Sequence, residues 1–356
     1  MKILLPFQDP YNRPLTHPIV SGGTEQFCKS IKDNFNKKNN KNDETRVFWI
    51  PFEQIKSPKQ SDKIEISQNI IDCAVGMKAD IIICNFAQAI YNNKTIIESP
   101  IPIMFVEHCI YPIPNVIYRW NQAIDKGHSM FFVSKWQKKK YREMAQRTGQ
   151  RVLPIDGYVN PSYCKVKPKL IEQEYDCGTI GRCDNGKKPF LLKQMTKGKD
   201  IKSLVITSKT QVNSDIKYYE RNKHWEDTLW DLPYKEVMEN ISKCKTYFST
   251  WNGETWGITA MEALSCGIPV ILNSDKRDKS GNHASEIIPA SKEHYKIIPQ
   301  NDKDALVKAI EDLKDVDRGE IQKMTWEKHS LKSWKEHMRK CMEDTVDKFD
   351  KLKNKK

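Results

Sequence analysis

Short apolar runs alternate with amphipathic stretches along the first half of the chain. The apolar runs have the length of buried strands and fall at 2–7, 46–52, 80–86, 101–108 and 130–135. Amphipathic stretches between them predict helices at 24–37 and 65–78. Strands that alternate with helices predict an α/β fold built on a parallel, doubly wound sheet.

The same alternation starts again at about residue 175. Strands are predicted at 175–182, 203–209, 245–250 and 268–274, with intervening helices at 190–198, 233–243 and 259–267. A long helical region without strands follows at about 304–352. The pattern therefore predicts two Rossmann-like halves joined near 160–174. In such proteins ligands bind at the carboxyl ends of the strands, in the cleft between the halves.

Composition and charge narrow the class of protein. No run approaches the roughly 18 apolar residues of a transmembrane helix, and the apolar stretch at the start is too short for a signal peptide, so we expect a cytoplasmic protein. The ten cysteines are scattered without zinc-site spacing, which predicts reduced core thiols and no metal site. The 59 basic and 46 acidic residues give a net charge of +13, which favours a polyanionic partner or a phosphorylated ligand.

Two glutamates, Glu254 and Glu262, stand eight positions apart at the beginning of a predicted helix. Glu254 follows the strand at 245–250, while Glu262 lies on the helix, which ends at Gly267. Backbone N–H groups at such a helix start suit a phosphate, and a carboxylate can accept hydrogen bonds from two vicinal hydroxyls. The arrangement suits a nucleotide sugar, and it equally fits an exposed loop glutamate followed by a solvated helix glutamate.

This segment resembles the E-x7-E signature of the retaining glycosyltransferases of family four, which have the GT-B fold. Further segments resemble that family in the same order, from residue 3 to about 315. They are the glycine-rich loop at 21–25, the strand-end histidine at 107–108, the interdomain segment at 156–157, the G-R-x4-K segment at 181–187 and the P-E-I-I-like stretch at 285–288.

The resemblance implies an enzyme that uses a UDP-sugar as co-substrate, without a prosthetic group and without a metal ion. Arg182 and Lys187 would neutralise the diphosphate as it leaves, and Glu262 would bind the ribose hydroxyls. His108 and Glu254 would be the catalytic residues that hold the sugar hydroxyls. The full set of donor-binding residues implied in this way is Gly22, Gly23, Arg182, Lys187, Thr255, Trp256, Gly257 and Glu262. Hexosyl or pentosyl transfer with retention of configuration is implied.

The resemblance also implies a division of the chain into three segments. We expect a Rossmann-like acceptor domain at 1–165, a Rossmann-like nucleotide-sugar domain at 166–325, and a C-terminal helix at 326–356 that packs back on the N-terminal domain. Between His108 and His128 we expect an aromatic, proline-rich loop near the acceptor.

Basic residues concentrate in the window 126–151, which holds eight basic residues and one acidic residue. One interpretation is a solvated helix face. The other is a stripe that follows DNA phosphates beside the acceptor site. Four of these residues share one face of a predicted helix, with Tyr141 on another face, because they recur at i, i+3, i+4 and i+7: Lys135, Lys138, Lys139 and Arg142.

The layout is also similar to that of the DNA-modifying sugar transferases of T-even-type bacteriophages, which glycosylate 5-hydroxymethylcytosine. We therefore expect a monomer that moves a sugar from a UDP-sugar to 5-hydroxymethylcytosine, or a related hydroxylated base, in double-stranded phage DNA in the host cytoplasm. The alternative is a peripheral-membrane transferase of lipopolysaccharide or capsule synthesis on an anionic membrane surface. A third possibility is a non-enzymatic nucleic-acid-binding protein, which would leave the donor-site residues without a role.

Overall fold

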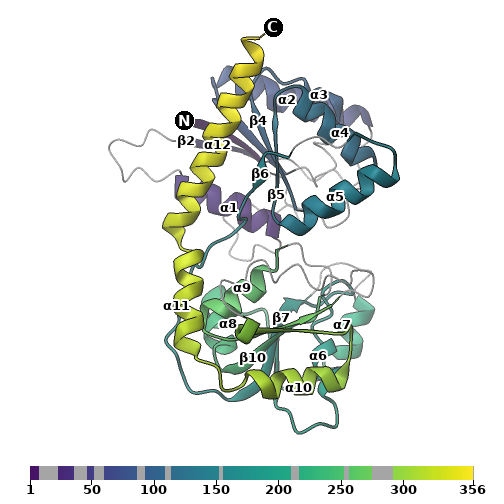
Figure 1. The fold of residues 1–356 in the computed structure, drawn as a ribbon, viewed down its shortest axis with the longest axis vertical. Helices are drawn as coiled ribbons and strands as arrows, with labels where there is room; N and C mark the ends of the chain where they lie inside the picture. The colour runs from purple at the N-terminus through teal and green to yellow at the C-terminus, as the bar shows by residue number, and fades with distance from the viewer. Residues whose placement is uncertain are drawn as a thin grey trace. The chain divides into compact units, whose positions relative to one another are not determined.

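The computed structural model describes residues 1–7, 23–35, 46–51, 60–85, 93–108, 114–151, 155–209, 216–251, 256–274 and 292–355. The chain forms two compact units, Met1–Ser162 with Lys332–Lys356, and Tyr163–Leu331 (Figure 1). The division falls a few residues from the boundaries expected at 165/166 and 325/326. Each unit holds one six-stranded parallel sheet, which confirms the predicted α/β fold with two parallel-sheet domains.

The sheet of the first unit has the order β2-β1-β3-β4-β5-β6, and every pair in it is parallel. Three of its inner strands, β3, β4 and β5, are buried at every position, as the apolar runs predicted. The strand order reverses between β1 and β3, where open α/β sheets bind ligands. The strands are β1 (Lys2–Phe7), β2 (Arg46–Pro51), β3 (Ile81–Asn85), β4 (Ile103–Glu107), β5 (Ser129–Phe132) and β6 (Gly157–Tyr158).

Helices connect these strands, and one of them corrects the sequence analysis. The region between His108 and His128 was expected as a loop, but it contains helix α4. Its buried residues Ile117, Trp120 and Ile124 recur at helical spacing, so one face of the helix packs into the core. The helices of this unit are α1 (Gly23–Phe35), α2 (Gln60–Gly76), α3 (Lys94–Ile97), α4 (Pro114–Asp125), α5 (Lys135–Arg147) and α12 (Leu331–Lys353).

Helix α12 packs on the first unit although it is far away in sequence (Figure 1). The indole N–H of Trp334 donates to the carbonyl of Asn160 over 2.8 Å. The ring of Phe349 stacks on buried His128 with centroids 5.2 Å apart. Lys348 forms an ion pair of 2.8 Å with Asp156, whose carboxylate also accepts the backbone N–H of Met130 on β5. The helix is therefore a structural part of this unit.

The sheet of the second unit has the order β12-β11-β10-β7-β8-β9 and is parallel throughout. Counted from β7, this is the Rossmann order, with the switch point between β7 and β10. The strands are β7 (Tyr175–Arg182), β8 (Ser203–Ser208), β9 (Thr228–Trp230), β10 (Cys244–Ser249), β11 (Val270–Asn273) and β12 (Tyr295–Ile298).

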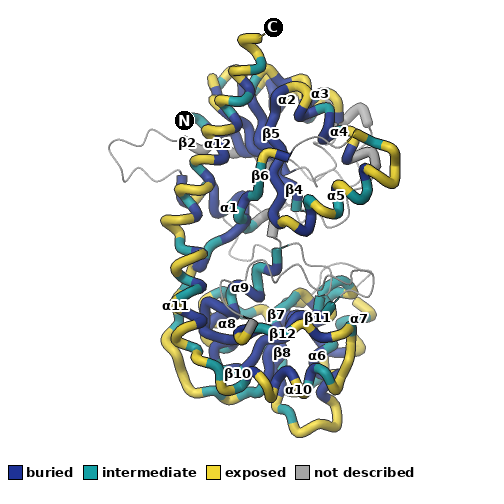
Figure 2. The backbone as a smooth tube through the Cα atoms, viewed as in Figure 1, coloured by how far each residue is buried: buried dark blue, intermediate teal, exposed yellow. Residues whose placement is uncertain are grey.

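The helices of the second unit cover this sheet, whose strands are mostly buried, whereas α10 alternates between buried and exposed positions (Figure 2). Gly178 on β7 lets the adjacent helix and strand approach closely, because an added Cβ would lie 2.5 Å from the sulfur of Cys244 and 2.7 Å from Ile241. The helices are α6 (Leu191–Thr196), α7 (Ile216–Asn222), α8 (Tyr234–Ile241), α9 (Ile258–Ser265), α10 (Lys303–Leu313) and α11 (Arg318–Lys328), with a short 3-10 helix at Lys292–His294.

Two expectations drawn from the composition concern the cysteines and membrane-spanning helices. Eight of the nine cysteines in the described ranges are buried. Among the described helices, none has the length and apolar content needed to cross a membrane.

Candidate functional site

Polar and aromatic side chains gather where the strands next to the second switch point end. Arg182 is the last residue of β7, Trp251 comes two residues after the end of β10, and Gly257 directly precedes α9. Tyr234 begins α8. Because the carboxyl ends of parallel strands meet at one edge of a sheet, these segments share the edge at which α/β folds bind ligands.

The loop after β7 is held in one conformation by Asp184. Its Oδ2 pairs with Nε of Arg182 at 3.1 Å, and its Oδ1 accepts the backbone N–H of Lys187 over 2.6 Å. On the other side, the hydroxyl of Thr250 donates to the carbonyl of Lys187 over 2.7 Å. The Asp184 side chain is 13% exposed and that of Arg182 is 45% exposed, so the carboxylate is fixed while the guanidinium reaches solvent. Arg182 at the end of the strand and Lys187 on the fixed loop are two cations that can neutralise a diphosphate.

Trp251 positions the second cation. The ammonium of Lys187 lies 5.2 Å from the centroid of the Trp251 ring, within the range of a cation–π interaction. Gly186 lies beside the same ring, and an added Cβ there would be 3.2 Å from the indole carbon Cζ3. The glycine therefore lets the loop approach the indole that holds Lys187.

Helix α9 begins at the same edge, and no side chain among the described residues caps its start. Its N-cap residue, Gly257, has φ of 66° and ψ of 58°, a left-handed conformation that glycine adopts without strain. The hydroxyl of Tyr247 on β10 donates to the hydroxyl of Thr259 over 2.7 Å and ties the first turn to the sheet. The first four N–H groups of a helix have no intrahelical acceptor, so a helix start without a side-chain cap suits an anion. Glu254 and Thr255 lie outside the described residues.

Glu262, on the second turn of α9, is half-buried and contacts residues from two other segments. Tyr234 and Lys165 both interact with its carboxylate. Burial raises the pKa of the Glu262 carboxyl to about 7, while the charge of Lys165 and the hydrogen bond from Tyr234 act in the opposite direction. Burial, together with the neighbouring Glu262, raises the pKa of the Cys164 thiol to about 12. A carboxylate in this setting can accept two hydroxyls of a ligand.

Trp256 packs within the second unit. Its indole meets the ring of His329 edge to face with centroids 5.9 Å apart, and it contacts the core cluster around α9. This packing accounts for the tryptophan as a structural residue, and its expected part in donor binding stays a prediction.

His108 in the first unit lies at the end of β4, next to the end of β3. Its Nε2 donates to Oδ1 of buried Asn85 over 2.9 Å, and the amide of Asn85 donates in turn to the sulfur of Cys28 over 3.1 Å. The ring of Phe27 on α1 meets the imidazole edge to face at 5.3 Å. Burial lowers the pKa of His108 to about 3, so the imidazole is neutral near pH 7. Gly23 is the first residue of α1, whereas Gly22 lies outside the described residues.

The basic face predicted around residue 138 lies on α5. Lys135, Lys139 and Arg142 are exposed, whereas Trp136, Gln137, Tyr141 and Ala145 face inward. Lys139 lies 3.9 Å from Glu143, and Lys138 lies 5.8 Å from the ring centroid of Tyr158. The structure therefore brings the four side chains together on one helix face.

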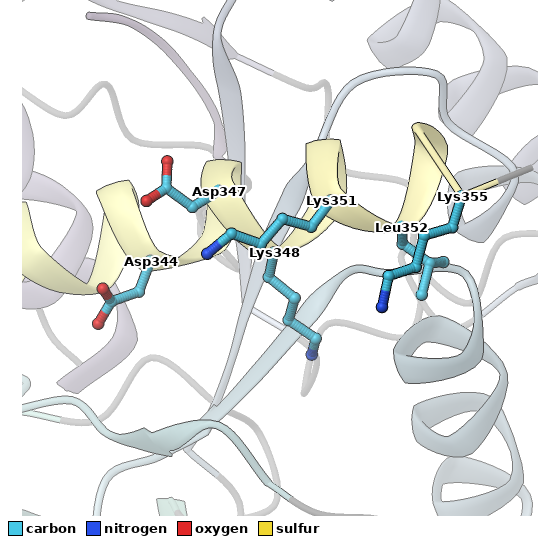
Figure 3. Close-up of a pocket in the computed structure, with 6 residues that line it drawn as sticks. All are labelled: Asp344, Asp347, Lys348, Lys351, Leu352 and Lys355. Carbon is cyan, nitrogen blue, oxygen red and sulfur yellow. The ribbon is translucent and has the colours of Figure 1, made fainter.

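A separate pocket lies along α12 (Figure 3). Figure 3 shows the six residues that line it, of which the first five lie on this helix and the last lies in the turn after it: Asp344, Asp347, Lys348, Lys351, Leu352 and Lys355. Lys348 is already bonded to Asp156 and to the carbonyl of His128. The pocket contains none of the predicted site residues.

Sequence reasoning missed four residues that shape these sites: Asn85, Lys165, Tyr234 and Trp251. Asn85 and Trp251 carried a usable signal, because each stands at the end of an apolar run that was predicted as a strand. Lys165 and Tyr234 carried none, because they meet Glu262 only through the tertiary fold.

Part of the chain is similar to a known protein family. Residues 172–329 match the family model described as glycosyl transferases group 1. No curated protein sequence matches the chain.

The chain is also similar to solved structures. HepE of Anabaena, in complex with UDP and glucose, is 11% identical with a TM-score of 0.67, over 96% of this chain and 99% of that one. The lipopolysaccharide outer core galactosyltransferase WaaB is 14% identical with a TM-score of 0.64, over 96% and 99%. A mutant of S. aureus TarM in complex with Fondaparinux, alpha-GlcNAc-glycerol and UDP is 15% identical with a TM-score of 0.57.

The TarM match covers 76% of this chain but only 58% of the length of TarM. At these identities the structural likeness shows the fold, whereas the sequence match concerns residues 172–329. The chain therefore has the GT-B fold, and its residues 172–329 are similar to the glycosyl transferases group 1 family.

Proposed function

We propose that the protein moves a sugar from a UDP-sugar to an acceptor hydroxyl. The observation that carries the proposal is the fixed loop with Arg182 and Lys187 at the same sheet edge as the start of α9, the helix of Glu262. The two cations would neutralise the departing diphosphate, and removing one such group costs on the order of 3 kcal/mol of transition-state stabilisation. The structures of HepE and TarM hold UDP, which supports a uridine donor.

Glu262 would accept hydrogen bonds from the ribose hydroxyls, because an ionised carboxylate accepts at both oxygens. His108 and Glu254 would hold the hydroxyls of the transferred sugar. His108 is suited to this work as a neutral group, since its imidazole can exchange hydrogen bonds with hydroxyls without bringing a charge. Retention of configuration, and a donor site that works without a metal ion, belong to the proposal through the resemblance to family four.

For the acceptor we propose double-stranded DNA that carries 5-hydroxymethylcytosine or a related hydroxylated base. The observation that favours it is the cationic face of α5, where Lys138 is half-buried and three cations are exposed: Lys135, Lys139 and Arg142. Cations at helical spacing can follow a phosphate backbone, which supplies much of the affinity of DNA-binding proteins. A base in a duplex would have to be flipped out before its hydroxyl could react.

A second acceptor class is a saccharide of lipopolysaccharide or capsule synthesis at an anionic membrane surface. The likeness to WaaB over 96% of this chain favours it, and basic helices bind anionic lipid as well as DNA. The non-enzymatic alternative is set aside, because residues 172–329 match a glycosyltransferase family.

The decisive experiment offers both acceptors to the same enzyme. The protein is incubated with a panel of UDP-sugars and either duplex DNA containing 5-hydroxymethylcytosine or purified lipopolysaccharide core, and the products are analysed by mass spectrometry. A hexose or pentose mass added to the digested nucleoside supports the DNA acceptor. Addition to the lipopolysaccharide core alone refutes it. An Arg182→Ala/Lys187→Ala double variant controls for contaminating activity.

The salt dependence of DNA binding tests the α5 face separately. Replacing its four cations by Ala should flatten the slope of log affinity against log salt by up to about 3–4, since each phosphate contact contributes roughly 0.9. The matched control removes four exposed lysines elsewhere: Lys303, Lys308, Lys323 and Lys332. An unchanged slope in the α5 variant, together with lost binding to anionic vesicles, would decide for the membrane surface.

A further inference from the structure

A tyrosine and an arginine that the donor site does not use lie side by side on the outer face of α4. Tyr118 is 53% exposed, and the guanidinium carbon of Arg119 lies 5.6 Å from the centroid of its ring, within the range of a cation–π interaction. Gln122 joins the two, since its amide donates to the Tyr118 hydroxyl over 3.1 Å and its Oε1 accepts from Nη1 of Arg119 over 2.6 Å. These three side chains, called here the α4 platform, hold a planar ring and a planar cation at the surface.

The α4 platform lies on the side of its helix that faces α5, the neighbouring helix of the same unit (Figure 1). The hydroxyl of Tyr141 on α5 donates to Oδ1 of Asn121 on α4 over 2.9 Å. Tyr118 stands three positions before Asn121 and is therefore its neighbour on the helix surface. The two helices follow the parallel strands β4 and β5, so both begin at the carboxyl edge of the sheet, where α/β folds bind ligands.

The surface around the α4 platform is cationic. Residues 114–151 hold nine basic residues and two acidic residues. Both acidic side chains are paired with cations, because Asp125 lies 3.8 Å from Arg151 and Glu143 lies 3.2 Å from Lys140. Such a surface fits a polyanion. A nucleic acid strand combines phosphates with planar bases, whereas an anionic lipid surface offers no planar group to the ring of Tyr118.

The geometry of the α4 platform suits the face of a base. Bases stack on tyrosine rings through their π faces, and an arginine beside the ring adds a cation–π contribution. Within a paired duplex the neighbouring bases cover these faces, so a base must leave the stack before it can reach an exposed ring. Gln122 holds Tyr118 and Arg119 in place before binding, which lowers the conformational entropy that is lost on binding.

We propose that the α4 platform stacks an unpaired base of a DNA strand whose phosphates lie along the cations of α5. The proposal rests on the DNA acceptor proposed above, and it adds a base-binding surface to the surface that binds the backbone. Stacking tolerates any base, since every base has a π face. The α4 platform should therefore favour DNA that is locally unpaired over DNA of a particular sequence.

The test measures affinity by fluorescence anisotropy for three duplexes of one sequence: fully paired, with a single mismatch, and with an abasic site in place of the mismatched base. The wild type should prefer the mismatched duplex, and the abasic site should remove this preference, because the base that would stack is missing. Tyr118→Ala should weaken binding of the mismatched duplex about tenfold, while Tyr118→Phe, which keeps the ring, should retain most of the preference. Neither variant removes a cation, so the salt slope should stay unchanged.

Val75→Ala is the matched control, because it removes a side chain that is 49% exposed from α2, another helix of the same unit. It should bind all three duplexes like the wild type. A wild type that binds DNA with steep salt dependence, together with a Tyr118→Ala variant that keeps the full preference, would overturn the inference while the DNA acceptor stands. No preference for the mismatched duplex in the wild type, or an equal preference for the abasic duplex, would also overturn it. A wild type that binds phosphatidylglycerol vesicles and no DNA would overturn the DNA acceptor and the inference together.

Discussion

Replacing Glu262 by Gln should stabilise the free protein at alkaline pH while weakening its binding of UDP. The amide has nearly the same shape and can still interact with Tyr234, but it carries no charge into the half-buried site. The carboxyl pKa is about 7 in the folded protein and 4.5 in the reference state. The favourable contribution of the neutral carboxyl is therefore complete below pH 4.5 and is lost as the pH rises through 7.

The size of the effect follows from the same two values. A pKa difference from 4.5 to about 7 corresponds to about 3 kcal/mol at about 1.4 kcal/mol per pH unit. Glu262 is half-buried, so solvent screening reduces this to about 1–2 kcal/mol. For a unit of this size, 1 kcal/mol corresponds to about 2–4 °C in melting temperature. Glu262→Gln should thus melt about 2–8 °C higher than the wild type at pH 9, and at the same temperature near pH 4.5.

Differential scanning fluorimetry across pH 4.5–9, with and without UDP, measures both sides of this trade-off. In saturating UDP the wild type should gain stability by mass action, by about 2.7 kcal/mol at 100 times Kd, and the variant should gain far less. A variant that is less stable than the wild type at pH 9, or equally shifted at every pH, would show that the ionised Glu262 carries no cost in the fold. Equal stabilisation of both proteins by UDP would remove Glu262 from the nucleotide site.

Three further outcomes follow from the described geometry. Arg182→Ala and Lys187→Ala should each lower kcat by about 10²–10³-fold with little change in melting temperature. As a control, Lys199→Ala removes an exposed lysine that is paired with an aspartate, and it should leave kcat unchanged. Wild-type kcat in both site variants would contradict the diphosphate role. Gly178→Ala should lower stability by about 1–3 kcal/mol in chemical denaturation, because its Cβ would lie 2.5 Å from a buried sulfur, and an unchanged midpoint would contradict this packing. The imidazole of His108 should remain neutral from pH 5 to 9, since its pKa is about 3. The His108→Gln variant identifies the NMR resonance of this imidazole by its disappearance. If that resonance titrates near pH 6–7 in the wild type, the burial of His108 is refuted.

The strands were predictable because parallel strands are buried on both faces and therefore read as uninterrupted apolar runs. The strand Ile81–Asn85, buried at all its positions, is such a case. The short edge strands Gly157–Tyr158 and Thr228–Trp230 gave no such run, because they have few residues and are only half-buried. Helix α4 was mistaken for a loop because prolines and aromatic residues dominated its start, although its buried positions follow the helical period.

The residues of the candidate site likewise fall into those that a local sequence pattern identifies and those that only the folded chain brings together. Arg182, Lys187 and Glu262 were found from the sequence, because each stands in a local segment with a recognisable spacing. Tyr234 and Lys165 lie 69 positions apart and contribute through the single carboxylate that both approach. Such a contact depends on the packing of α8 and of an extended segment around α9, which no local pattern encodes.

Helix α12 gives the first unit an unusual order of assembly during synthesis. Residues 1–162 emerge from the ribosome first, but the helix that supplies Trp334, Lys348 and Phe349 to that unit follows after the whole of the second unit. At 5–20 residues per second, the intervening 163–331 take roughly 8–34 s to synthesise. During that interval the surface around His128 and Asn160 lacks its covering helix, and the second unit, continuous in sequence, is the first that can complete its fold.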